Sequence, residues 1–269
     1  MGRIRSFVLV AVALAGGLLG VSTADAAIRG KVVEYRDGEV TMKGYLAWND
    51  AVKGKRPGVL VVHEWWGLND YARKRARMLA ELGYTALAVD MYGGGKEALH
   101  PDDAGAFSSA VMKNMDLMAA RFRAAMDLLG KQPTVDAGRI GAIGYCFGGA
   151  VVLNMARQGL DLKGVASFHG NLATAKPAEP GAVKAKVMAF NGGADTFITP
   201  EQVGAFAAEM ARAGADFRFI SYTGAKHSFT NPDADAYARK FGLPLAYDAA
   251  ADRDSWDEMS RFFRRVFGR

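Results

Sequence analysis

The feature that most constrains the fold is an alternation of short apolar runs with longer segments of helical periodicity. The runs Gly58–His63 and Thr85–Asp90 are nearly free of charge, as strands buried on both faces are. Each is followed by a segment in which apolar residues recur every three or four positions. A chain that repeats this order is predicted to form an α/β fold, with a mostly parallel central sheet and helices on both faces.

The remaining elements fit this reading. Two strands before the first buried run, Lys31–Tyr35 and Val40–Ala47, are joined at Asp37-Gly38, a dipeptide typical of a hairpin turn. Further strands are expected at Arg139–Gly144, Val165–His169, Lys186–Asn191 and Phe217–Tyr222. Helices are expected at Asp70–Leu82, Asp103–Leu129, Gly148–Arg157, Thr199–Ala213 and Ala250–Val266.

The first 26 residues have a different character. Two arginines precede an apolar run at residues 7–21, and Ala-Asp-Ala follows at residues 24–26. This order is typical of a cleaved secretory signal peptide. The run is shorter than the roughly 20 residues that cross a bilayer, so an uncleaved anchor is the weaker alternative. We expect a periplasmic or secreted protein with no stable membrane association after cleavage, and residues 27–269 as one domain.

The net charge of +6 raises the question of nucleic-acid binding. The basic residues gather at residues 73–77 and 261–269, both within amphipathic helices. In the first helix, Ala72, Ala76 and Leu79 form the expected buried face, so the basic side chains are expected to be solvated. No nucleic-acid motif accompanies them. We expect no nucleic-acid partner and a monomeric protein.

The only cysteine follows a predicted strand, within Gly-Tyr-Cys-Phe-Gly-Gly at residues 144–149. A single cysteine excludes an intramolecular disulfide and a multi-cysteine zinc site. The sequence has the layout of a nucleophile elbow, in which small residues flank a sharp strand-to-helix turn. The start of the following helix favours a thiolate at Cys146. The alternative is a small buried cysteine with a packing role.

Two further strands end in residues that complete a nucleophilic site. Asp195 follows the strand Lys186–Asn191, and His227 follows the strand Phe217–Tyr222. With Cys146 first, the chain order is the nucleophile, acid, histidine order of α/β-hydrolases. His227 would act as the base and Asp195 would orient it. Taken singly, Asp195 could be a turn residue and His227 a loop histidine.

Glu64, Trp65 and Trp66 follow the first buried strand. In an α/β-hydrolase this position supplies an N–H group to the oxyanion hole. Glu64 therefore acts in the site, or it is a satisfied acid beneath an aromatic lid.

Together these motifs resemble the dienelactone hydrolase family, over most of the chain from about Val40 to the last helix. The matching segments are His63–Asn69, Asp90–Tyr92, Gly144–Gly149, Gly192–Phe197 and His227–Phe229. The resemblance implies an α/β-hydrolase fold, a Cys146–His227–Asp195 triad and a role for Glu64 in generating the thiolate. It also implies an oxyanion hole from the N–H groups of Trp65 and Phe147, an acyl-thioester on Cys146, and no metal or organic cofactor.

The sequence departs from the family pattern at two positions. Lactone-cleaving members are expected to hold the substrate carboxylate with two arginines, where this chain has Gly94 and Asn231. Neither residue replaces a bidentate arginine contact. We therefore expect a different small ester, lactone or thioester, in a pocket lined by Trp65, Trp66, Tyr92, His169 and Phe197. His169 could be functional or a packed strand-end residue.

Two alternatives to a lactone-cleaving enzyme stay open. One is an esterase or thioesterase without lactone activity. The other is a non-catalytic binding protein, or a thiol sensor at Cys146, on a hydrolase scaffold. The presence of Glu64, Cys146, Asp195 and His227 together favours catalysis. Asn231, Pro232 and Asp233 are expected to begin a loop and helix that cover the site, or simply to cap a helix.

Overall fold

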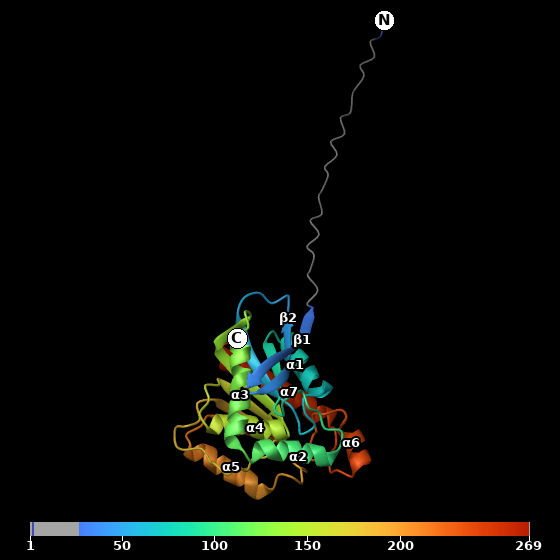
Figure 1. Ribbon diagram of the computed structural model, residues 1–269, viewed down its shortest axis with the longest axis vertical. Coiled ribbons are helices and arrows are strands. Elements are labelled where there is room, and N and C mark those ends of the chain that lie inside the picture. Colours follow the sequence, from blue (N-terminus) through green and yellow to red (C-terminus); the bar gives the residue numbers. More distant parts are fainter. Residues whose placement is uncertain (1, 3–26, 269) are drawn as a thin grey trace.

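The computed structural model describes residue 2 and residues 27–268. The predicted signal peptide, except for residue 2, thus lies outside the described residues. The rest forms an eight-stranded sheet with helices on both faces, which confirms the predicted fold class (Figure 1). No helix among the described residues has the length and apolar character needed to cross a membrane.

The strands follow the order β1-β2-β4-β3-β5-β6-β7-β8 across the sheet. The first two form the predicted hairpin, and β2 also pairs antiparallel with β4. All other neighbouring strands are parallel. Their bounds are β1 Ile28–Asp37, β2 Val40–Asn49, β3 Arg56–Val62, β4 Thr85–Val89, β5 Val135–Tyr145, β6 Gly164–Phe168, β7 Lys186–Gly192 and β8 Phe217–Tyr222.

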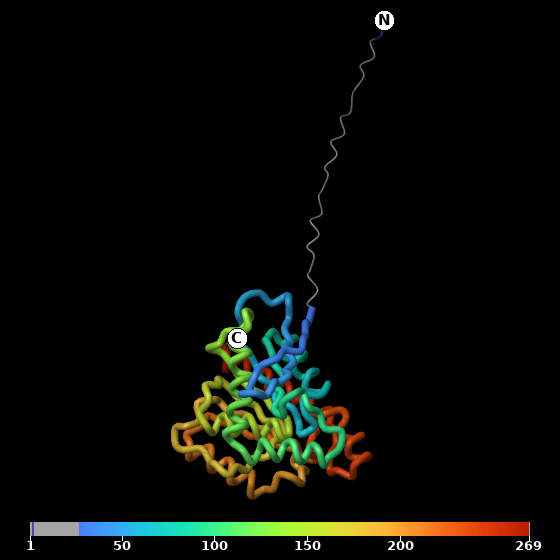
Figure 2. The backbone as a smooth tube through the Cα atoms, viewed as in Figure 1, coloured from blue at the N-terminus to red at the C-terminus, as the bar shows by residue number. Residues whose placement is uncertain are grey.

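The helices of the described chain cover the sheet on both sides, and the path between them is followed most easily in the backbone tube (Figure 2). Their bounds are α1 Asp70–Glu81, α2 Pro101–Met112, α3 Met115–Gly130, α4 Phe147–Arg157, α5 Pro200–Arg212, α6 Ala234–Phe241 and α7 Ala249–Phe267. At α5, the Thr199 side chain and Gln202 form the capping box that their spacing predicts.

The central strands divide their side chains between two cores. In β3, Leu60 and Val62 pack with the side chains of α3, α4 and α5. The alternate residues Val59 and Val61 pack with those of α1 and α7. This alternation follows from the period of two in a strand. Because both faces of β3 are buried, the strand is apolar throughout. Polar groups collect instead at the carboxyl ends of the strands.

One predicted helix is wrong in its extent. The segment Asp103–Leu129 forms two helices, α2 and α3, that meet at Lys113 and Asn114. The Asn114 side chain accepts a hydrogen bond from the Leu117 N–H at 3.0 Å and so begins a new helix. Apolar periodicity does not register the break, because the apolar spacing continues across it.

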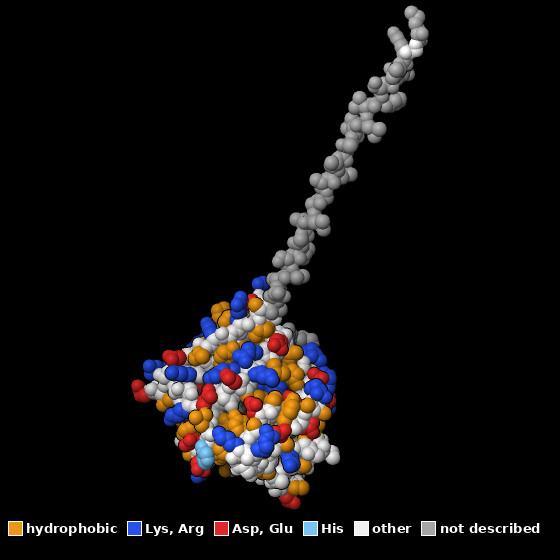
Figure 3. All heavy atoms as spheres, turned by 90° about the vertical axis from the view of Figure 1, so that its right-hand side faces the viewer, with side chains coloured by type: hydrophobic (Ala, Val, Ile, Leu, Met, Phe, Trp, Pro, Cys, Tyr) orange, Lys and Arg blue, Asp and Glu red, His pale blue; other side chains and the backbone are white. Residues whose placement is uncertain are grey.

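The basic cluster of α1 also differs from prediction at one residue. Ala72, Ala76 and Leu79 are buried as expected, but Arg75 is buried with them and pairs with Asp252 of α7 at 2.5 Å. Arg75 lies three residues after Ala72 and four before Leu79, which places it on the same buried face. Elsewhere, on the face drawn in Figure 3, charges of both signs are interspersed.

Candidate active site

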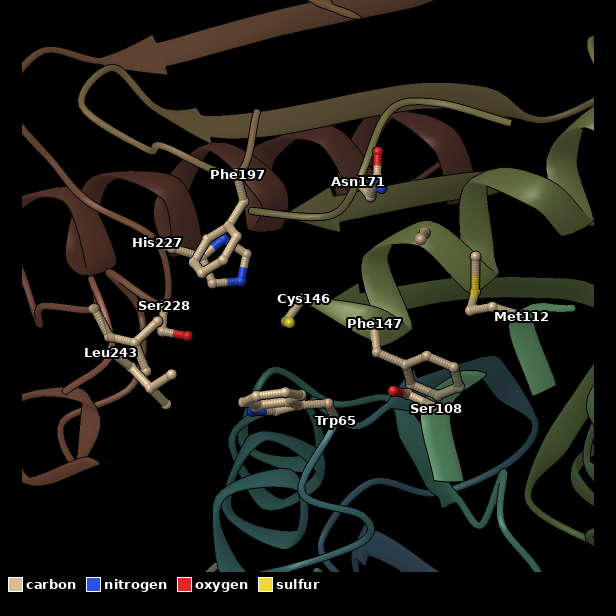
Figure 4. A pocket seen from close by; sticks show the side chains of 12 residues that line it. Trp65, Ser108, Met112, Cys146, Phe147, Asn171, Phe197, His227, Ser228 and Leu243 are labelled. Carbon is tan, nitrogen blue, oxygen red and sulfur yellow. The ribbon is translucent and has the colours of Figure 1, made fainter. Parts of the chain in front are cut away.

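The nucleophile elbow joins β5 to α4. Cys146 has a φ of 52°, which a non-glycine residue adopts only where the surroundings hold it. The turn is tight: a Cβ on Gly144 would lie 2.0 Å from the Gly148 carbonyl oxygen, and one on Gly148 would lie 2.2 Å from that of Val62. The two glycines therefore allow the sharp turn that directs the Cys146 sulfur into a cavity (Figure 4).

Asp195 and His227 converge on this sulfur from two other strand ends. His227 Nδ1 lies 2.8 Å from Asp195 Oδ2, and both side chains are buried. The Phe197 N–H donates to the other carboxylate oxygen at 2.8 Å, which fixes the orientation of Asp195. The second nitrogen of His227 faces Cys146 (Figure 4). The structure thus brings together the three residues that the strand-end argument selected.

The surroundings of His227 favour its charged form. Burial alone would lower its pKa. The negative charge of Cys146, the hydrogen bonds to Asp195 and Cys146, and the charge of Asp195 outweigh burial and raise the pKa to about 10. The buried carboxylate of Asp195 thus favours the imidazolium form of His227.

Two backbone N–H groups lie next to the elbow. Phe147 is the first residue of α4, and Trp65 lies shortly after the end of β3. The Gly148 N–H donates to the His63 carbonyl oxygen at 3.1 Å, and this bond holds the elbow against the segment after β3. The Tyr92 hydroxyl donates to the Trp65 carbonyl at 2.9 Å. No acceptor for the N–H groups of Trp65 and Phe147 is found among the described residues, which leaves both groups available to a ligand.

Glu64 is buried behind the cavity and faces two neutral partners. Its Oε1 accepts from the Ser228 hydroxyl at 2.9 Å, and its Oε2 accepts from the Asn231 amide at 2.6 Å. Burial raises its pKa above the usual range, although these two hydrogen bonds act in the opposite direction. Asn231, predicted to stand where the family would place an arginine, thus holds Glu64 without neutralising it. Gly94 lies in the loop after β4 with a φ of 69°.

A cavity of about 300 Å³ opens above Cys146. Its lining is mostly apolar and comes from several elements, and Cys146 and His227 are its only ionisable members. The lining residues are Trp65, Ser108, Met112, Cys146, Phe147, Ala150, Asn171, Phe197, His227, Ser228, Leu243 and Leu245.

Of the five residues expected to line the pocket, Trp65 and Phe197 border the cavity, whereas the other three do not. Trp66 does not line the cavity, because its buried ring stacks on Tyr237 of α6 with 4.5 Å between ring centres and lies edge-on to Trp65 at 5.0 Å. Tyr92 is buried behind Trp65. His169 is fully buried beneath the elbow, where its Nδ1 lies 3.1 Å from the Cys146 nitrogen.

Some lining residues were not predicted. Ser228 directly follows His227, and its position in the motif His-Ser-Phe could have indicated that it lies at the site. Leu243 and Leu245 belong to the irregular segment after α6, where Leu245 bridges to His227. The expected covering of the site thus comes from the segment that follows the helix. The part of the chain that the structure describes holds no cluster of three or more acidic, histidine or cysteine residues able to bind a metal.

The order of the sheet, the elbow after β5, the acid after β7 and the histidine after β8 define an α/β-hydrolase.

Comparison with known proteins gives the family. Residues 42–267 match the model of the dienelactone hydrolase family, and the chain belongs to it. A relative named protein usf, from Aquifex pyrophilus, is 28% identical over 87% of this chain and 98% of its own length.

Solved structures agree. The dienelactone hydrolase-like promiscuous phosphotriesterase P91, from metagenomic libraries, is 35% identical with a TM-score of 0.82 over 90% of this chain and 99% of that one. A protein titled m3DLH is 38% identical with a TM-score of 0.84, over the same shares of the two chains.

Proposed function

We propose that this member of the family hydrolyses a small, uncharged ester or lactone through an acyl-enzyme on Cys146. The proposal rests on the arrangement of Cys146, His227 and Asp195 at the floor of the cavity. The Cys146 sulfur faces His227, whose other nitrogen lies 2.8 Å from a buried carboxylate. A nucleophile, a base and an orienting acid in this arrangement suit acyl transfer.

The chemistry follows from the residues. The Cys146 thiolate attacks the carbonyl carbon, and the displaced electron pair moves to the carbonyl oxygen. The N–H groups of Trp65 and Phe147 stabilise that oxyanion, and one such donor is typically worth about 2.7–4 kcal/mol in the transition state. Collapse of the intermediate expels the alkoxide, which takes a proton from His227. Water then loses a proton to His227 and attacks the thioester carbonyl. Collapse of this second intermediate breaks the C–S bond, which releases the acid and regenerates the Cys146 thiolate.

We assign Glu64 a part in generating the thiolate, on the resemblance to the family. To approach the thiol it would leave Ser228 and Asn231. Because both partners are neutral, leaving them breaks hydrogen bonds but no ion pair. The raised pKa of Glu64 makes it a ready acceptor for a thiol proton.

The cavity supports an uncharged substrate. Its lining contains no arginine or lysine, and apolar side chains dominate its surface. Burying a substrate carboxylate there without an arginine or lysine, beside the candidate thiolate, would be costly. Esters with apolar acyl groups therefore fit better than a lactone that carries a carboxylate.

The test compares kcat/KM for p-nitrophenyl acetate and butyrate with that for dienelactone, with Cys146→Ala as the control. We expect the neutral esters to be preferred, and the Cys146→Ala protein to be inactive on all three. Turnover of dienelactone faster by orders of magnitude would overturn the assignment of an uncharged substrate.

A second candidate is the hydrolysis of neutral phosphotriesters. It is favoured by the mostly apolar cavity and by the 35% identity with P91, a protein described as a promiscuous phosphotriesterase. Release of p-nitrophenol from paraoxon by the wild type, and none by Cys146→Ala, would support it. Equal rates for the two proteins would exclude it.

We also propose that the protein acts outside the cytoplasm after loss of residues 1–26. The intact mass of protein expressed from the full sequence tests this. A chain beginning at Ala27 is expected, and a retained N-terminal segment would contradict the proposal.

A further inference from the structure

Three non-glycine residues of the described chain have a positive φ, and all three lie at the candidate site. They are Cys146 at 52°, His169 at 41° and Ser228 at 57°. Such conformations persist only where neighbouring groups hold them in place. The groups that hold Cys146 therefore decide where its sulfur points.

The Cys146 N–H is held by two acceptors. One is the Phe168 carbonyl oxygen at 3.0 Å, a backbone contact that continues the pairing of β5 with β6. The other is Nδ1 of His169 at 3.1 Å, which is the only side-chain atom among the described residues to bond this N–H. A side chain that does not line the cavity thus contacts the backbone of the candidate nucleophile.

The far side of the His169 ring is fixed as well. Its Nε2 lies 2.8 Å from the Thr230 hydroxyl, which in turn lies 2.7 Å from the hydroxyl of Tyr71. Arg75 donates to the Tyr71 hydroxyl at 3.2 Å and to the Thr230 carbonyl at 2.6 Å, and it pairs with Asp252. A buried polar chain therefore connects the elbow to α1 and α7.

These contacts define one state of the ring. Nδ1 must carry a lone pair to accept the Cys146 N–H, so the ring hydrogen is on Nε2, where it donates to Thr230. Burial, and then the charges of His227 and Arg75, lower the pKa of His169 well below its usual value, which keeps the ring neutral. His169 also lies edge-on to His227, with 5.1 Å between the ring centres.

We propose that His169 is a positioning residue for Cys146. By accepting the Cys146 N–H at Nδ1 while Thr230 anchors Nε2, it holds the elbow in the conformation that directs the sulfur at the substrate and at His227. The inference rests on the proposed function for its kinetic readout only, because the reactivity of the thiol can be measured without any substrate.

Two substitutions separate the two ends of the ring. His169→Asn places an amide oxygen near the position of Nδ1, and asparagine tolerates a positive φ. His169→Gln places an amide nitrogen near Nε2 and loses the acceptor at the elbow. Thr230→Val removes the anchor while leaving His169 in place. His100→Asn, at the exposed cap of α2, is the matched control.

For each variant we would measure kcat and KM on p-nitrophenyl acetate, the rate of Cys146 alkylation by iodoacetamide, and the melting temperature. His169→Gln is expected to lower kcat and the alkylation rate by about 10-fold, the scale of one buried hydrogen bond lost, with little change in KM. His169→Asn is expected to restore both to within about 3-fold of the wild type. Thr230→Val is expected to fall between them, and His100→Asn to behave as the wild type.

Two results would overturn the proposal. One is folded His169→Gln protein with wild-type kcat and alkylation rate. The other is His169→Asn as impaired as His169→Gln, since the acceptor would then not be what matters. If the wild type cleaved no ester, the proposed function would fail, and the order of the alkylation rates would still decide the role of His169.

Discussion

Replacing Asp195 by asparagine tests the link between the acid and the histidine most sharply. The Phe197 N–H donates to one oxygen of Asp195, and the other oxygen lies 2.8 Å from His227 Nδ1. In Asp195→Asn the amide oxygen is expected to keep the Phe197 N–H, so the NH₂ group faces Nδ1. That contact selects the tautomer with hydrogen on Nε2, which cannot accept a proton from Cys146.

The size of the effect can be worked from the pKa of His227. The value of about 10 instead of 6.5 corresponds to roughly 5 kcal/mol in favour of the imidazolium. Cys146 and Asp195 share this stabilisation, so loss of the Asp195 charge removes only part of it and lowers the rate on the order of 10²-fold. With the wrong tautomer added, the loss approaches the ~10⁴-fold known for the same change in a serine triad.

The assay is kcat on p-nitrophenyl acetate for Asp195→Asn beside Asp216→Asn, an exposed acid paired with Lys186. We expect a loss between about 10²-fold and 10⁴-fold for the first and none for the second. A folded Asp195→Asn protein that keeps a third or more of the wild-type rate would refute the assignment of Asp195.

Three further changes have expected outcomes. Glu209→Gln leaves the buried guanidinium of Arg157 without its counter-charge. Differential scanning calorimetry is expected to show a free energy of unfolding lower by about 3–5 kcal/mol, or a melting temperature lower by roughly 6–20 °C. An unchanged melting temperature would contradict this. Burial lowers the pKa of His63 to about 4, so only the unfolded chain takes up this proton between pH 6.5 and 4. Stability should therefore fall by roughly 3 kcal/mol over that interval, and by less in His63→Gln. Phe197→Ala opens the cavity beside His227. The ratio of kcat/KM for p-nitrophenyl butyrate to that for the acetate is expected to rise by about 10-fold. An unchanged ratio would show that Phe197 does not contact the acyl group.

Much of the fold could be predicted because its determinants are local or periodic. The apolar run of β3 is buried on both faces, and the Thr199 capping box begins α5 as its spacing indicates. The positions of Cys146, Asp195 and His227 followed from topology, since the carboxyl ends of parallel strands lie at one edge of a sheet.

The errors arose where three-dimensional packing decides. The direction of the Trp66 ring depends on its contact with Tyr237. Because Tyr237 is 171 residues away in the sequence, no local pattern predicts that the two rings meet. Arg75 is buried because Asp252 of α7 and the Thr230 carbonyl accept hydrogen bonds from its guanidinium, whereas its charge alone would assign it to solvent. Asn114 separates α2 from α3 through its own side chain, without a proline or glycine to mark the break.

The central claim is that Cys146 becomes acylated during turnover. The most direct test is electrospray mass spectrometry of the wild type and Cys146→Ala, each mixed briefly with p-nitrophenyl acetate and quenched in acid. The account predicts a transient acetyl adduct on the wild type alone, mapped to the peptide that contains Cys146, together with release of nitrophenol. Nitrophenol release by Cys146→Ala at the wild-type rate, or an adduct on another residue, would contradict it.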